Sequence, residues 1–177
     1  MKKQIKITLI VLAALIAAFG AVSLIWYYTA FRPYDRYVEQ LEERYSVNQI
    51  DAFRSYAEDE AGYSYYIKRP DFWSWSGNLS VSIPVFQLGS GDEMPYVDGL
   101  LLWPKGDSCE LGVMLYEYSE DERGVTANGV QLYLDGEGNY LPDGIADEEG
   151  QAVLDRHREN VDVLLEKLYQ TWPQFAP

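Results

Sequence analysis

The sequence predicts an α+β protein, with an N-terminal transmembrane helix followed by one soluble domain in which an antiparallel β-meander packs against N- and C-terminal helices. Three observations support this fold class. An apolar run from Ile7 to Ala30 contains no charged residue, short segments between residues 63 and 134 alternate apolar with polar residues, and segments with helical spacing flank them. Helices at both ends of a set of strands favour packing on one face of an antiparallel sheet.

The apolar run is long enough to be a membrane anchor. As a helix, Ile7 to Ala30 would be about 36 Å long, which exceeds a hydrocarbon core of about 30 Å. A cleaved signal peptide is the alternative, because Ala18-Phe19-Gly20 and Ala21-Val22-Ser23 both have the small-residue pattern of a cleavage site. The run continues past both sites and ends in Trp26-Tyr27-Tyr28, which is typical of a membrane interface. We therefore favour an uncleaved anchor.

The charges that flank the run predict its orientation. Lys2, Lys3 and Lys6 precede it, whereas Arg32 and Arg36 are followed by an acidic stretch. Because positive residues favour the cytoplasmic side, we expect a single-pass protein of the cell membrane. We expect residues 1–6 to be a cytoplasmic N-terminus, 7–30 the transmembrane anchor and 31–177 one extracytoplasmic domain.

The expected outer domain is strongly acidic. Three of the 14 basic residues precede the apolar run, so 11 basic residues accompany all 28 acidic residues in the domain, a formal net charge of −17. Binding to nucleic acid requires several lysine or arginine contacts to phosphates, so this class of partner is excluded. A cationic partner is compatible with the charge. Cys109 is the only cysteine, so an intramolecular disulfide is impossible, and we interpret it as a buried strand residue.

Apolar spacing predicts the elements of the domain. Residues 33–45 have the pattern of an amphipathic helix that begins at Pro33, and a capping box at residues 46–49 predicts that a second helical segment continues to residue 57. A strand within residues 47–57 is the alternative. A final helix is predicted over residues 153–172, and the predicted strands are 63–67, 72–75, 79–83, 100–103, 111–116 and 130–134. The short links between strands predict antiparallel neighbours.

Trp73 and Trp75 are the candidate binding residues. They lie two residues apart in the predicted strand 72–75, so they are expected to share one face of it. Tryptophans are highly buried on average, and burial in the core is therefore the interpretation that we favour. If the pair is exposed, its two indoles could stack on sugar rings or on an extended peptide.

Histidine and acidic residues are the remaining candidates for chemistry. His157 is the only histidine, and it lies four residues from both Val153 and Val161, on or beside the apolar stripe of the last helix. We interpret it as a packed or hydrogen-bonded residue, because no nucleophile motif accompanies it. No catalytic residue, metal site or cofactor is predicted.

A stretch of alternating oxygen ligands resembles part of a calcium loop. The candidate ligands would be Asp135, Glu137, Asn139 and Asp143. The pattern fails at Tyr140, where a calcium loop needs glycine, and at Ala146, where it needs glutamate. A hairpin turn explains the run with fewer assumptions.

Together these features predict a non-enzymatic, membrane-anchored binding domain whose partner is an envelope protein or a surface component. Two alternatives stay open. One is a carboxylate-based hydrolase that acts on an envelope glycan, and the other is a cation-responsive sensor that uses the acidic stretch 135–149. The sequence does not fix the oligomeric state.

Overall fold

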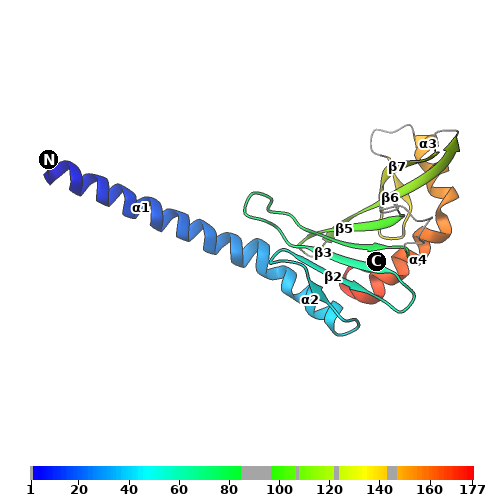
Figure 1. The fold of residues 1–177 in the computed structure, drawn as a ribbon, viewed down its shortest axis with the longest axis horizontal. Helices are drawn as coiled ribbons and strands as arrows, with labels where there is room; N and C mark the ends of the chain where they lie inside the picture. Colours follow the sequence, from blue (N-terminus) through cyan, green and yellow to red (C-terminus); the bar gives the residue numbers. More distant parts are fainter. Residues whose placement is uncertain (1, 85–96, 107, 122–123, 143–146) are drawn as a thin grey trace.

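The chain has an α+β fold, as predicted. A computed structural model describes residues 2–84, 97–106, 108–121, 124–142 and 147–177. A long N-terminal helix leads into a domain in which one antiparallel sheet has helices on one face (Figure 1). The antiparallel meander between terminal helices is therefore confirmed.

The N-terminal helix enters the domain without a break. It consists of α1 (Lys2–Trp26), η1 (Tyr27–Phe31), η2 (Arg32–Tyr34) and α2 (Asp35–Glu42). These elements follow one another without interruption, and the stretch Gln4–Glu42 within them comprises 39 residues. Its apolar window is not buried by any part of the domain that the structure describes, and by length and composition this helix can cross a membrane. Its last turns belong to the domain core, where Tyr37, Val38 and Leu41 are buried.

The strands of the sheet lie in chain order. Within the described residues the order is β1-β2-β3-β4-β5-β6-β7-β8, and every neighbouring pair is antiparallel. Five of the six predicted strands are confirmed, and β6 and β7 extend beyond the predicted ends. The bounds are β1 (Asn48–Gln49), β2 (Arg54–Glu58), β3 (Ser64–Lys68), β4 (Asn78–Ser82), β5 (Gly99–Lys105), β6 (Ser108–Asp121), β7 (Gly124–Leu134) and β8 (Tyr140–Leu141).

The predicted helix within residues 47–57 is wrong, and the alternative of a strand is confirmed. Ser55 and Ala57 are buried at a period of two, which fits a strand. The Asp51 carboxylate accepts hydrogen bonds from the backbone N–H of Phe53 and from Nε of Arg54, which builds a turn in place of a helix. Ile50 and Phe53, which suggested helical spacing, are exposed.

The predicted strand 72–75 is also wrong, because these residues form a loop between β3 and β4. The Asp71 carboxylate accepts hydrogen bonds from the backbone N–H groups of Trp73 and Ser74, at 2.9 and 2.7 Å. Such a side-chain turn uses backbone donors that a strand would pair with its neighbour. Aromatic alternation therefore gave a false strand signal here.

The C-terminal helix is divided at His157. The two parts are α3 (Asp147–Arg156) and α4 (Arg158–Thr171), and a short 3-10 turn, η3 (Pro173–Phe175), follows. His157 has φ −105° and ψ 11°, outside the helical region, so α4 changes direction from α3 at this residue. The sequence predicted one helix, since the apolar spacing continues through the junction.

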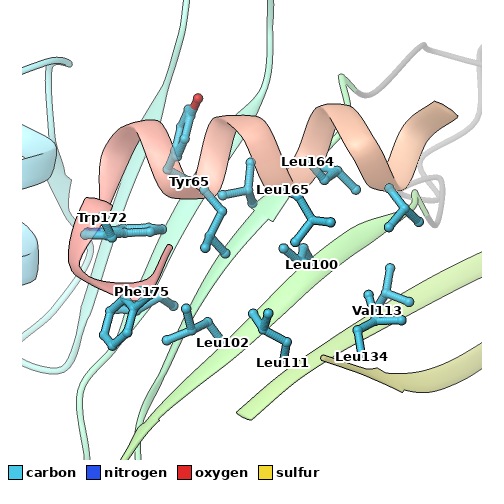
Figure 2. Packing of buried hydrophobic residues seen from close by; sticks show 14 of the residues in the cluster. Tyr65, Leu100, Leu102, Leu111, Val113, Leu134, Leu164, Leu165, Trp172 and Phe175 are labelled. Carbon is cyan, nitrogen blue, oxygen red and sulfur yellow. The ribbon is translucent and has the colours of Figure 1, made fainter. Parts of the chain in front are cut away.

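The core lies between the sheet and the helices. α4 crosses the sheet over β4 and β5, and Figure 2 shows its leucines facing those of the strands. Trp172 is fully buried, and its Nε1 donates a hydrogen bond to the Tyr37 carbonyl oxygen at 3.1 Å. The residues around Trp172 therefore close the core against α2, which lies far away in the sequence.

An ion pair fastens α4 to the β2–β3 turn. Lys167 Nζ lies 2.6 Å from Asp59 Oδ2, and the Asp59 side chain is only 7% exposed. Backbone N–H groups of Ala61 and Tyr63 donate to the other carboxylate oxygen. Desolvation opposes ionisation of Asp59, but these hydrogen bonds outweigh it and hold the pKa of the carboxyl below its usual value. The hydrogen bond between Lys167 and Asp59 also raises the pKa of the Lys167 ammonium group.

Removing this lysine should destabilise the domain in a pH-dependent way. Lys167→Met leaves Asp59 buried without its counter-ion, so we expect the free energy of unfolding near neutral pH to fall by about 1–3 kcal/mol. Because the folded pKa of Asp59 is lowered, its contribution is present above the unfolded pKa of about 3.9 and is lost as the pH falls through the folded value. Denaturant titrations of both proteins across this range measure the difference.

The exposed Asp51–Arg54 pair offers a matched control. Its atoms are also 2.6 Å apart, but the side chains are 38% and 49% exposed. Arg54→Met should therefore cost much less stability than Lys167→Met, because solvent screens the exposed pair. Equal losses from the two variants, or a Lys167→Met loss that does not shrink in acid, would contradict the assignment.

Candidate binding surfaces

The sheet face opposite the helices carries aromatic and apolar side chains. Strand pairing places Tyr56, Tyr66, Ser80, Leu101 and Gly112 in one row across the sheet, and Gly112 pairs with Tyr133. Each alternates along its strand with a core residue. We call this surface the aromatic face and define it by its half-buried members, which are Tyr56, Tyr66, Ser80, Leu101, Trp103, Met114 and Tyr133. The buried hydrophobic side chains of α2 and α4, with Val153 and Leu154 of α3, belong to the core on the other side of the sheet.

A glycine allows Trp103 to lie flat on the aromatic face. A Cβ at Gly112 would come within 2.9 Å of the Trp103 ring, so the indole covers the backbone of the neighbouring strand. The ring also lies 6.3 Å from that of Tyr133. Flat rings across a sheet give a broad contact surface that costs little conformational entropy to order.

Charged side chains border the aromatic face. Glu58 accepts a hydrogen bond from the Tyr56 hydroxyl at 2.8 Å, and Glu110 pairs with Lys105 at 2.6 Å. An apolar centre with a polar border is the usual anatomy of a protein–protein interface. This surface was not predicted from the sequence, although aromatic residues at the polar positions of the strands, such as Tyr133 between Leu132 and Leu134, indicate it.

A buried carboxylate joins His157 to the sheet. Asp98 directly precedes β5 and is 4% exposed. It accepts hydrogen bonds from the Tyr116 backbone N–H at 2.8 Å and from Asn160 Nδ2 at 2.8 Å, and its Oδ2 lies 2.7 Å from His157 Nδ1. His157 at the helix junction and Asn160 in the first turn of α4 thus share one acceptor. Asp98 was not identified from the sequence, because it follows a segment without periodicity.

The Asp98–His157 pair resembles the orienting half of a catalytic triad. A carboxylate on Nδ1 holds the imidazole in one orientation and would leave Nε2 to act as a base. Within the part of the chain that the structure describes, no serine or cysteine lies within hydrogen-bonding distance of His157. Among the described residues, the Asp98–His157 pair holds the α3–α4 junction against the start of β5 and against β6.

Trp73 and Trp75 are not core residues, and the burial that we favoured is wrong. Their side chains are 91% and 54% exposed, in the loop between β3 and β4. The strand that would have placed them on one face is absent. They are therefore available for an interaction, and their loop contacts Trp26 at the end of α1 through Asp71 and Phe72.

Three of the four candidate calcium ligands, Asp135, Glu137 and Asn139, lie in a hairpin turn. Both carboxylate oxygens of Asp135 accept hydrogen bonds from Asn139, one from its backbone N–H at 2.8 Å and one from its side chain at 2.9 Å. These bonds lower the pKa of Asp135. Glu137 is exposed, and Asp143 lies outside the described residues. No group of three or more metal-ligating side chains occurs among the residues whose placement is described.

A polar depression of about 510 Å³ lies beside the Asp59–Lys167 ion pair. Arg44, Tyr45 and Glu60 contribute to its walls. Its lysine is protonated and paired, so it is a poor nucleophile. The depression offers charged and hydrogen-bonding side chains, among them Glu58, Glu60 and Ser46.

Comparisons with known proteins give no further guidance. The chain matches no protein-family profile, and no curated protein and no solved structure is significantly similar to it.

The role of His157 can be tested with two substitutions. His157→Ala removes a hydrogen-bond partner of buried Asp98, so we expect a loss of about 1–3 kcal/mol in the free energy of unfolding. In His157→Asn the amide nitrogen can take the place of Nδ1, so we expect much of this loss to be recovered. Thermal unfolding followed by near-ultraviolet circular dichroism measures both. Unchanged stability in His157→Ala, with loss of a measured activity, would overturn the structural role.

Proposed function

We propose that this chain is a single-pass membrane protein that displays a non-enzymatic binding domain on the extracytoplasmic side, where it recognises a cationic protein of the envelope or cell surface. The observation that carries the proposal is the uninterrupted helix Gln4–Glu42. Its first part is apolar and exposed, and its last part is buried in the domain. An exposed apolar helix of this length is costly in water, and a bilayer removes that cost.

The anchor holds the domain close to the membrane surface. No flexible linker separates α1 from α2, because η1 and η2 continue the helix. Phe31 already contacts the domain, since its ring lies 5.9 Å from that of Phe53 and under the Arg69 guanidinium. The three lysines before the helix favour a cytoplasmic N-terminus, which puts the domain outside.

The aromatic face supports a protein partner. Its flat rings and apolar side chains can be desolvated by a partner surface, and such aromatic anchors supply most of the affinity in protein interfaces. The formal charge of −17 over residues 31–177 would attract a cationic partner and raise its association rate. The charge would raise the association rate and the selectivity, whereas the aromatic face would supply most of the affinity by slowing dissociation.

Membrane anchoring predicts a defined biochemical behaviour. The full-length chain should resist extraction by alkaline carbonate and should keep its translated N-terminus, because the apolar helix stays in the bilayer. Sequencing of the mature N-terminus and protease digestion of intact cells check cleavage and orientation. A mature N-terminus at Ala21 or Leu24, or a domain protected from external protease, would contradict this part of the proposal.

Site-specific crosslinking tests the binding surface. A photoreactive benzoylphenylalanine in place of Tyr66 or Tyr133 on the aromatic face should capture a protein partner in intact membranes. The same residue in place of Val163, which is exposed on α4, is the matched control and should capture little. Capture should decrease as salt screens the charges over a Debye length of about 8 Å. Equal capture from both faces, or none from the aromatic face, would refute this surface.

A further inference from the structure

The loop between β3 and β4 lies against the N-terminal helix. The Phe72 ring is 5.7 Å from the rings of both Phe19 and Trp26 in α1. Trp26 Nε1 donates a hydrogen bond to the Asp71 carbonyl oxygen at 3.0 Å. In Figure 1 this loop reaches back along α1 from the sheet. The β3–β4 loop of the domain therefore lies along the side of the apolar helix α1.

The contact lies within the apolar part of α1. Phe19 and Trp26 are two helical turns apart on one face, a distance of about 10 Å along the axis. If the hydrocarbon begins near Ile7, a thickness of about 30 Å extends to about Trp26. Phe72, which contacts both rings, then lies below the level of Trp26.

The tip of the loop is apolar and unusually exposed. Trp73 is 91% exposed and Trp75 is 54% exposed, whereas Trp26 and Trp103 are half-buried and Trp172 is buried. The only charged side chain between Pro70 and Gly77 is Asp71, whose carboxylate is turned toward the backbone N–H groups of its own loop. Tyr27 and Tyr28 are exposed at the same end of α1. Tryptophan and tyrosine are the residues that favour the membrane–water interface.

We propose that the β3–β4 loop inserts Phe72, Trp73 and Trp75 into the outer leaflet of the bilayer that α1 crosses, and so forms a second membrane contact. This inference rests on the proposed anchoring. The occupant of the exposed aromatic surface is lipid, because the surface continues that of an apolar helix which the same bilayer would cover. Two contacts restrict the tilt of the domain, so its orientation toward the membrane is fixed.

Depth measurement with spin labels tests the insertion. The full-length chain carries Cys109→Ala, so that one engineered cysteine can be labelled with a nitroxide, and it is reconstituted in vesicles of phosphatidylcholine and phosphatidylglycerol. The test position is Trp73→Cys. Leu15→Cys is the control inside the proposed span, and Thr126→Cys is the aqueous control on the β6–β7 hairpin, at the far end of the domain from α1 (Figure 1). Collision rates with oxygen and with a water-soluble nickel complex give the depth of each label.

The three labels separate this inference from the proposed anchoring. We expect the oxygen-to-nickel ratio to be highest at position 15, lowest at position 126 and severalfold above the aqueous control at position 73. If position 15 lies in hydrocarbon while position 73 matches position 126, the loop does not insert and the anchoring stands. If position 15 is itself aqueous, the anchoring fails, and the insertion fails with it.

Quenching by brominated lipids gives a second readout, which needs no label. Of the five tryptophans, Trp26, Trp73 and Trp75 would be within reach of the bilayer, and Trp103 and Trp172 would not. Trp73→Phe combined with Trp75→Phe should lower the quenched fraction of the emission, whereas Trp103→Phe should raise it. A rise in the quenched fraction after the double substitution would show that the loop faces water and would overturn the inference.

Discussion

The fold depends on the continuity of one helix. The segment from Gln4 to Glu42 contains an apolar length that the domain does not bury and a final part whose Tyr37 and Leu41 are fully enclosed by it. A continuous helix couples the position and rotation of its two ends, because a sharp kink would require the local loss of its backbone hydrogen bonds. The π-helical turn at Tyr27–Phe31 alters the phase of this helix and sets which of its faces meets the sheet.

Two buried carboxylates then hold the C-terminal helices on the sheet. Asp59 binds Lys167 from the β2–β3 turn, and Asp98 binds His157 and Asn160 at the start of β5. Each anion is enclosed by donors, as a buried charge requires. The single histidine, which we interpreted from the sequence as a packed or hydrogen-bonded residue, binds Asp98 in this framework. The other side of the sheet carries the aromatic rings of the aromatic face, which we propose as the recognition surface.

The sequence predicted the fold class because its strongest signals are local. Period-two alternation in segments such as Leu111–Leu115 and Leu79–Ile83 arises from one-sided burial, and the meander pairs only neighbours. The errors arose where side chains bond to nearby backbone. Asp51 and Asp71 each capture backbone N–H groups and make turns, which removed a predicted helix and a predicted strand. The site residues were harder to predict, since Asp98 and His157 are 59 positions apart and their pairing depends on tertiary packing.

The closure of the core by Trp172 has a consequence for how the chain is made. The sheet can pair strand by strand as the polypeptide emerges, because each strand needs only its predecessor. The side of α2 that carries Tyr37 is covered only after the C-terminal residues have been synthesised. Trp172 donates a hydrogen bond to the Tyr37 carbonyl oxygen, and the Phe175 ring lies 5.6 Å from that of Tyr37. During synthesis α2 would therefore lie beside an incomplete sheet with Tyr37 exposed to solvent. The chain is thus most vulnerable to aggregation and proteolysis in the interval before its last helix is released.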